Sequence, residues 1–221
     1  MHITSEIYQV GGSGFSASED AAVYLACFDN HAAIIDAGCG ESIQTILRNI
    51  KSCGVKSEQV DYLFLTHCHF DHTGGAEALA EALQCTIVAH ERDAAFLESG
   101  NDSVTAASWY GSTLEPFHVD IKISGSGKDF SLGDRIIKAI HVPGHSPGSL
   151  VYLTVSDNQK IIFGQDIHGP LDPGLLSDRA DYLKSLKRIL ALKADILCEG
   201  HFGIYKGKED VKQFIKSYIS G

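Results

Sequence analysis

The sequence lacks three features that define common functional classes: an excess of basic residues, a long apolar run and a paired-cysteine motif. Its 221 residues include 28 acidic and 18 basic side chains, which give a formal net charge of −10. Nucleic-acid-binding proteins usually gather Lys and Arg on one face, so no nucleic-acid partner is expected. The longest apolar runs, such as residues 21–28, are far shorter than the roughly 20 residues that span a bilayer. No membrane segment is expected either.

The six cysteines are scattered along the chain and form no C-x-x-C pair. The first ten residues also lack the basic and apolar regions of a signal peptide. Together these absences indicate a cytoplasmic protein with reduced thiols. A hydrophobic content of 44% over 221 residues is sufficient for one well-packed core, so we expect a single domain over residues 1–221.

Short β-type segments and amphipathic segments alternate along the chain. Three β-type segments at 7–12, 22–28 and 32–38 predict an antiparallel meander, and Ile43, Ile46 and Ile50 have helical spacing. The near-continuous apolar run at 60–65 predicts a buried strand. The second half repeats this order, with β-type segments at 134–142, 149–155 and 160–166 before helical segments at 181–192 and 209–219. Strands followed by helices in each half favour two sheets packed face to face with helices outside.

The segment from His67 to His72 gathers three imidazoles and a carboxylate between a predicted strand and a predicted helix. Alternate side chains of an extended stretch point the same way, so His67, His69 and Asp71 are expected to face one point. The turn that follows is expected to bring the His72 side chain to the same point. Imidazole nitrogens and carboxylate oxygens are ligands of catalytic zinc, whose three protein ligands leave a position open for water. The segment therefore predicts a metal site with donors enough for two ions.

Three further donors follow later β-type segments: His145, Asp166 and His201. Strand ends that lead into loops on one rim of a sheet are where α/β proteins usually assemble their sites. Neighbouring glycines permit the tight turns that such loops need. We therefore expect these three side chains to converge on residues 67–72.

The order H-x-H-x-D-H, then His, Asp and His, resembles the metallo-β-lactamase-fold superfamily over nearly the whole chain, in particular its glyoxalase-II-like and lactonase-like branch. The resemblance implies an αββα sandwich of two mixed β-sheets, with a metal groove at one edge of the sheets. It also implies two divalent metal ions per chain, with Zn²⁺ as the first choice and Fe or Mn as alternatives. The pattern assigns His67, His69 and His145 to one ion, Asp71, His72 and His201 to the other, and Asp166 to both as a bridge.

The activity implied by the resemblance is hydrolysis of a small thioester, ester or lactone. Two ions that share a water lower its pKa from ~15.7 to about 7 and present a bridging hydroxide to the carbonyl carbon. Asp71 is the expected catalytic carboxylate, which orients the hydroxide and carries a proton to the leaving group. Asp36 is a candidate partner for one ligand histidine.

Five residues are candidates for substrate contacts. Trp109, Tyr110, Phe117 and His118 belong to residues 99–128, a stretch rich in turn formers that is long enough to favour a functional role. His168 lies two residues beyond Asp166 and is expected near the metals.

The same set of donor residues is compatible with other functions. A mononuclear Fe(II) persulfide dioxygenase-like oxidoreductase would keep positions open for O₂, and metal analysis with oxygen consumption separates it from the hydrolase. A non-catalytic effector-binding module and a phosphodiesterase are the lesser alternatives. The expected partner is a small molecule, and the sequence leaves the oligomeric state open.

Overall fold

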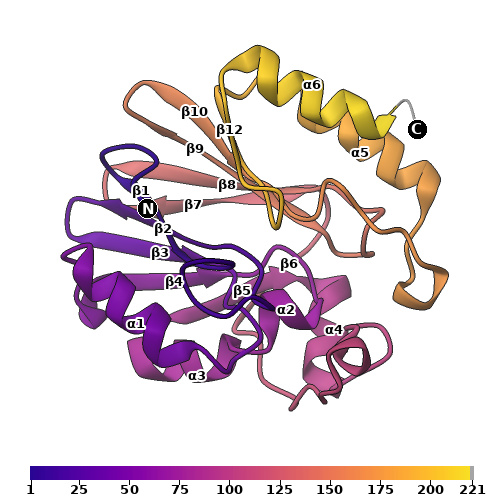
Figure 1. The fold of residues 1–221 in the computed structure, drawn as a ribbon, viewed down its shortest axis with the longest axis horizontal. Coiled ribbons are helices and arrows are strands. Elements are labelled where there is room, and N and C mark those ends of the chain that lie inside the picture. The colour runs from indigo at the N-terminus through magenta and orange to yellow at the C-terminus, as the bar shows by residue number, and fades with distance from the viewer. Residues whose placement is uncertain (220–221) are drawn as a thin grey trace.

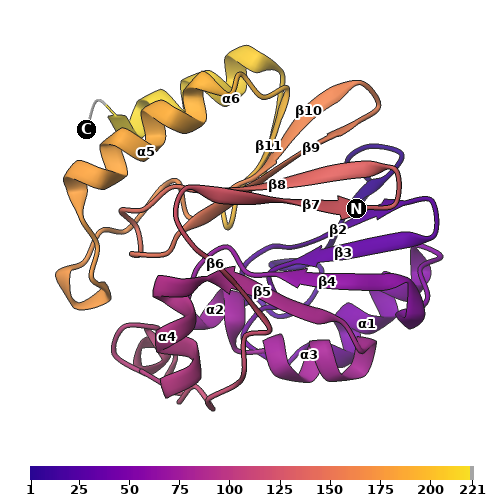
Figure 2. The same cartoon turned by 180° about the vertical axis from the view of Figure 1, so that it is seen from behind.

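Two six-stranded β-sheets lie face to face between two layers of helices (Figure 1). The structure is a computed structural model that describes residues 1–219. Helices α1 to α4 cover the outer face of the first sheet, and α5 and α6 cover the outer face of the second, as the view from behind also shows (Figure 2). This arrangement confirms the αββα sandwich predicted from the sequence.

The first sheet contains the N-terminal half of the chain. Its order is β1 to β6 in sequence, with antiparallel pairing up to β3 and parallel pairing from β3 onward. The strands are β1 (Ile7–Gly11), β2 (Val23–Phe28), β3 (His31–Ile35), β4 (Val60–Phe64), β5 (Thr86–His90) and β6 (Ile121–Ile123). The helices are α1 (Ile43–Ser52), α2 (Phe70–Thr73), α3 (Ala76–Leu83) and α4 (Glu91–Ser99).

The second sheet has the order β12-β11-β10-β9-β8-β7, and only β10 and β11 pair in parallel. Its strands are β7 (Gly127–Leu132), β8 (Arg135–His141), β9 (Leu150–Ser156), β10 (Gln159–Phe163), β11 (Ile196–Cys198) and β12 (Ile204–Lys206). Helices α5 (Arg179–Ala191) and α6 (Lys208–Ile219) complete this half.

The apolar runs of the sequence become strands that are buried on both faces. In β2, Val23 and Leu25 point to the helices, while Tyr24, Ala26 and Phe28 point to the other sheet. This follows from the two-residue period of a strand. Three hydrophobic clusters result, one under each helical layer and one between the sheets.

Aromatic rings form the centre of the cluster between the sheets. The Phe64 ring centroid of the first sheet lies 4.8 Å from that of Tyr152 and 5.0 Å from that of Phe130, both of the second sheet. Full burial of one such side chain contributes on the order of 1.5–3 kcal/mol. These contacts hold the two sheets at a fixed separation.

Two buried tyrosines cross between the sheets with their hydroxyl groups. Tyr24 of the first sheet donates to the Glu199 carbonyl oxygen at 2.7 Å, and Tyr152 of the second donates to the Leu65 carbonyl oxygen at 2.8 Å. Both accepting carbonyls lie just past the end of a strand, β11 and β4 respectively. Each tyrosine therefore ties to the opposite sheet one of the two strand ends from which the 67–72 segment and His201 continue.

The structure differs from the sequence-based interpretation in the stretch 99–128. We expected it to be irregular, but it contains the 3₁₀ helix η2 (Ala107–Tyr110), strand β6 and the start of β7. Strand β6 has only three residues, too few to show a two-residue period, and its pairing with β5 determines its conformation. None of the helices within residues 1–219 is long and apolar enough to span a bilayer.

Replacing Tyr152 by Phe is expected to lower the free energy of unfolding by about 1–3 kcal/mol, because it leaves the buried Leu65 carbonyl without its partner. Chemical denaturation measures the change. Tyr8→Phe is the matched control, since the Tyr8 hydroxyl also donates to a carbonyl, that of Ser5, but at the surface. Equal losses in the two variants would contradict the inter-sheet role.

A stacked histidine pair lies outside the 67–72 cluster. The rings of His90 and His141 are 3.8 Å apart between centroids and nearly parallel. Burial lowers the pKa of both, and each also has a cationic neighbour, Arg92, that disfavours a second positive charge. Both imidazoles therefore bind a proton less readily in the folded protein than a free histidine does.

The unfolded chain binds protons at these two positions as the pH falls through the usual histidine pKa of about 6.5, whereas the folded chain binds them only at lower pH. The contribution of this pair to stability therefore falls as the pH drops from about 7 to about 5. In His141→Gln this acid-dependent loss is expected to shrink by about 0.5 kcal/mol, a modest value because the ring is partly exposed. Urea unfolding at both pH values measures this difference in the free energy of unfolding. An unchanged pH dependence in His141→Gln would contradict the lowered pKa of the two imidazoles.

Candidate metal centre

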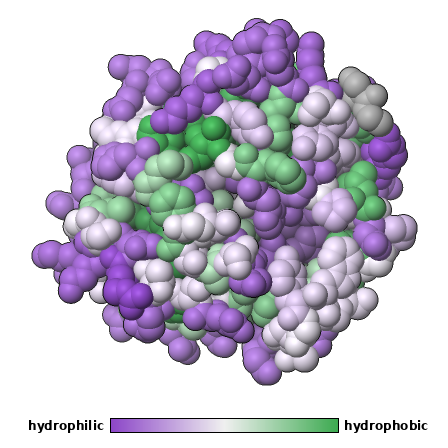
Figure 3. Space-filling model, in the orientation of Figure 1, coloured by the Kyte–Doolittle hydropathy of each residue, from purple (hydrophilic) through white to green (hydrophobic). Residues whose placement is uncertain are grey.

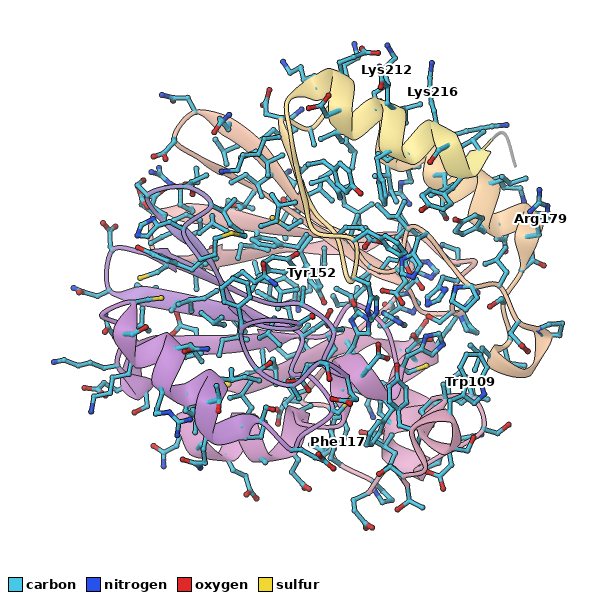
Figure 4. The ribbon with its side chains drawn as sticks, viewed as in Figure 1. Trp109, Phe117, Tyr152, Arg179, Lys212 and Lys216 are labelled. Atoms are coloured by element: carbon cyan, nitrogen blue, oxygen red, sulfur yellow. The ribbon has the colours of Figure 1, made fainter. Side chains whose placement is uncertain are left out.

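Seven His and Asp side chains from four loops meet at one edge of the two sheets, where Figure 4 shows nitrogen atoms gathered to the right of centre. The segment after β4 supplies four of them, and the loops after β8, β10 and β11 supply one each. The seven are His67, His69, Asp71, His72, His145, Asp166 and His201, of which all but His201 are buried. The structure thus brings together every side chain that the sequence proposed as a metal donor.

The first donor group consists of three imidazoles. The His69 Nδ1 atom lies 3.0 Å from the Nε2 atoms of both His67 and His145. Nitrogens about 2.0–2.1 Å from a tetrahedral metal ion lie roughly 3.3 Å from one another. The three nitrogens are therefore spaced as the ligands of one ion.

The second donor group lies beside the first. The Asp71 Oδ2 atom is 3.0 Å from His201 Nε2 and 3.8 Å from His72 Nε2. Asp166 stands between the groups: its Oδ2 atom is 3.6 Å from His145 Nε2 and 3.3 Å from His201 Nε2, and its Oδ1 atom is 3.1 Å from His72 Nε2. This geometry suits a carboxylate shared by two ions.

Three buried atoms of the donor residues make no hydrogen bond within residues 1–219: His69 Nε2, His72 Nε2 and Asp166 Oδ1. The last two face each other at 3.1 Å across the second group. Buried polar atoms are rarely left unsatisfied. A cation between them would satisfy both, so the residues present fit a divalent metal ion.

Hydrogen bonds orient three of the five imidazoles of the two groups with Nδ1 turned away from the centre. The Asp36 carboxylate accepts from His72 Nδ1 at 2.7 Å and from the Thr66 hydroxyl at 2.8 Å. That hydroxyl lies 3.0 Å from His67 Nδ1 and can accept its proton. The same carboxylate thereby leaves Nε2 of both His67 and His72 free for a metal.

His145 is oriented in the same way by a backbone group, since its Nδ1 lies 3.0 Å from the Pro170 carbonyl oxygen. The expectation that Asp36 partners a donor histidine is thus matched by its contact with His72. The sequence did not reveal the relay through Thr66.

The charges of the centre are unbalanced without a cation. Burial and neighbouring imidazoles hold the pKa of His67 well below its usual value, so its lone pair is available. Burial would also lower the pKa of His72, but Asp166, Asp71 and Asp36 together raise it well above its usual value. Protons on the second group balance its carboxylates, and a metal ion would displace them.

Two buried carboxylates in this region escaped the sequence analysis. Glu199 accepts hydrogen bonds from His168 Nδ1 and from the backbone N–H groups of His201 and Phe202, each at 2.8 Å. Its signal in the sequence is a charged residue at the end of an apolar strand. Glu199 holds the loop that carries His201.

The second of these, Asp93, accepts from the backbone N–H groups of Cys68 and Gly148 and from the Ser146 hydroxyl. Burial raises the pKa of Asp93 to about 6, against the opposing effect of these hydrogen bonds. Asp93 joins the loop of His67 and His69 to the loop of His145. It lies in helix α4, where no local pattern distinguishes it from a surface acid.

A cavity of about 170 Å³ opens above the donors, and Figure 3 shows a hydrophilic hollow in this part of the face. Its lining consists of His69, Asp71, Ala106, Trp109, Tyr110, His145, Asp166, His168, Pro170, Leu175 and His201. Three of the five residues expected to contact substrate, Trp109, Tyr110 and His168, are among them.

Phe117 and His118 lie elsewhere. Phe117 packs into the core between the first sheet and its helices, and Figure 4 places it well below Trp109. His118 is at the surface, where its Nδ1 is 3.1 Å from a Glu98 carboxylate oxygen. The chain turns away from the cavity after η2, because Ala106 and Gly111 on either side of it adopt left-handed conformations.

Comparisons with known proteins agree with this geometry. A sequence model of the Metallo-beta-lactamase superfamily matches residues 19–201. A probable metallo-hydrolase of Methanocaldococcus jannaschii is 29% identical over 65% of this chain and 65% of its own length. An acyl-coenzyme A thioesterase of Gallus gallus is 27% identical over 98% of this chain and 84% of its own.

Among solved structures, a metallo-beta-lactamase of Cronobacter sakazakii with a HARLDQ motif superimposes with a TM-score of 0.84. The alignment covers 100% of this chain and 91% of that one at 20% identity, a likeness of fold. With the family match over residues 19–201, these findings show that the chain belongs to the metallo-beta-lactamase superfamily.

Proposed function

We propose that this protein is a hydrolase that uses two divalent metal ions, with Zn²⁺ the first choice, to cleave the carbonyl bond of a small thioester, ester or lactone. The observation that carries the proposal is the pair of donor groups that share Asp166 at the floor of one cavity. Relatives whose names describe a probable metallo-hydrolase and an acyl-coenzyme A thioesterase support the reaction class.

The residues of the centre have three proposed roles: they hold the metal ions, transfer a proton and orient the substrate. His67, His69 and His145 would hold one ion, Asp71, His72 and His201 the other, and Asp166 both. The ions would supply the Lewis acidity that makes water nucleophilic near neutral pH and polarises a carbonyl.

Asp71 faces the cavity with one oxygen 3.0 Å from His201. From there it can orient the attacking water and accept its proton, then deliver that proton to the leaving group. His168, held by Glu199 at the cavity wall, is placed to contact the substrate.

The second donor group favours two ions over one. A single Fe(II) with open positions for O₂, as in a persulfide dioxygenase, needs only the first group and Asp166. In this chain Asp71, His72 and His201 form a second set, with their donor atoms close together. One iron per chain with oxygen consumption and no hydrolysis would overturn the hydrolase in favour of that oxidoreductase.

The metal requirement has a direct test. Zinc-loaded protein is expected to bind two ions per chain and to hydrolyse members of a thioester, ester and lactone panel, with phosphodiesters as the negative class. A chelator should lower turnover by at least about 100-fold, and added Zn²⁺ should restore it, because the ions supply the nucleophile.

Metal content measured by elemental analysis should fall to one ion in His201→Ala and in His67→Ala, with His2→Ala as the control. Two ions retained in both donor variants would contradict the assignment.

Asp36 provides a test of the orienting hydrogen bonds. In Asp36→Asn, the amide oxygen is needed by the Thr66 N–H, so the amide NH₂ faces His72 Nδ1. The imidazole must then carry its proton on Nε2 and cannot bind a metal there. We expect a 10- to 100-fold loss of affinity, on the order found for such partners, that is largest for the second ion, because Asp36 contacts His72 directly and His67 only through Thr66. Competition with a metal-sensitive dye measures it, and Asp181→Asn on α5 is the surface control.

A further inference from the structure

Exposed apolar side chains gather at the mouth of the metal cavity. Within residues 1–219, the large hydrophobic residues that remain exposed are Met1, Trp109, Tyr110, Ile136, Val155, Leu176 and Phe202. Trp109 and Tyr110 line the cavity, Leu176 follows the lining residue Leu175, and Phe202 follows the lining residue His201. We call Trp109, Tyr110, Leu175, Leu176 and Phe202 the apolar collar; Leu175 is its one buried member, and the Tyr110 hydroxyl group donates to Asp71.

Specific contacts fix the positions of residues in the collar. The Phe70 N–H, in the metal loop, donates to the Thr105 carbonyl oxygen at 2.7 Å, which anchors the start of η2, and the Tyr110 ring packs on that of Phe70. On the other side, the Phe202 ring lies 4.5 Å from that of His168. Trp109 nevertheless remains 58% exposed. Apolar surface maintained against water around a cavity marks a place for an apolar ligand.

The charge of the cavity argues in the same direction. Within residues 1–219, its lining includes no Lys or Arg, while Asp71 and Asp166 form its floor. The whole chain carries a formal charge of −10. The two ions of the proposed function would offset these carboxylates at the floor, but an anionic group at the far end of an acyl chain would meet no side-chain cation among the lining residues.

The volume limits the size of the group. An apolar cavity of about 150 Å³ accommodates one benzene molecule, and this cavity measures about 170 Å³. Part of that space lies over the polar floor, where the reacting carbonyl must sit. The whole cavity, this part included, therefore fits an acyl group of about six carbons that extends from the carbonyl toward Trp109.

We propose that the enzyme selects uncharged, apolar acyl groups of about six carbons. The proposal rests on the proposed hydrolase function, and it follows from the apolar collar, the charges of the lining residues and the volume of the cavity. Trp109 is the specificity-determining residue, because it lines the cavity and has the largest apolar side chain among the lining residues. The selectivity arises from burial of the acyl chain and not from the ions, which treat every carbonyl alike.

The first experiment compares N-acetylcysteamine thioesters of acetyl, hexanoyl and glutaryl groups on the zinc-loaded enzyme. Hexanoyl and glutaryl have similar lengths, and only glutaryl carries a charge. We expect kcat/KM for hexanoyl to exceed both others by about 10-fold or more, since each buried methylene distinguishes substrates by a small factor and the factors multiply.

The Trp109→Ala variant is expected to lower kcat/KM for hexanoyl by about 10-fold and to leave acetyl within about 2-fold, whereas Trp109→Phe retains most of the preference. Val155→Ala is the matched control, because Val155 is exposed to a similar degree but belongs to β9 and lines no part of the cavity. Equal use of hexanoyl and glutaryl, or equal effects of Trp109→Ala on acetyl and hexanoyl, would overturn the proposal while leaving the hydrolase intact.

A second readout does not depend on turnover. Trp109 is the only tryptophan of the chain, so its fluorescence reports directly on the collar. Titration with hexanamide, which is not expected to be cleaved, should change the emission saturably, and titration with glutarate should not. A saturable response without hydrolysis of any substrate would reject the proposed reaction and keep the apolar site. Identical responses to the two compounds would reject the site.

Discussion

The structure depends on the electrostatic balance at the rim where strands of both sheets end. Asp71, Asp166 and Asp36 are buried there with four imidazoles, and protons alone satisfy them only in part, since His72 Nε2 and Asp166 Oδ1 remain without partners. Burying carboxylates is costly unless positive charge compensates them. A divalent cation is the compensation that the donor geometry fits. The loops are accordingly fixed by further buried groups: Asp36 orients two imidazoles, Asp93 joins the loops of the first donor group, and Glu199 holds the loop of His201.

The proposed chemistry and the proposed selectivity use different parts of the same cavity. The floor is polar and rigid, so it can treat any activated carbonyl in the same way. The walls come from η2, from the segment after Asp166 and from the loop after β11. These segments lie outside the sheets, and side chains such as Trp109 and Leu175 provide no metal donor atom, so they can vary more freely than the floor. A superfamily fold with an unchanged floor can therefore serve several substrates through its walls.

The sequence predicted most of the fold because its strands are apolar on both faces and its helices have regular spacing, as in β2 and α1. It also predicted that the seven candidate donors lie together, because they follow strand ends in a recognisable order. It failed where tertiary contacts determine the conformation: β6 and β12 are three-residue strands defined by their neighbours. Glu199 and Asp93 act on loops distant in sequence, so no local pattern marks them. The directions of Phe117 and His118 depend on left-handed residues around η2, which composition does not reveal.

Only one short connection, residues 124–126, passes from the first sheet to the second. The two halves of the chain are thus joined by a short linker. Because the linker keeps them close, each half is at a high effective concentration relative to the other. Each donor group draws two side chains from the first half and one from the second. An ion bound in either group would therefore contact both halves of the chain. Its binding free energy would strengthen the association of the two sheets.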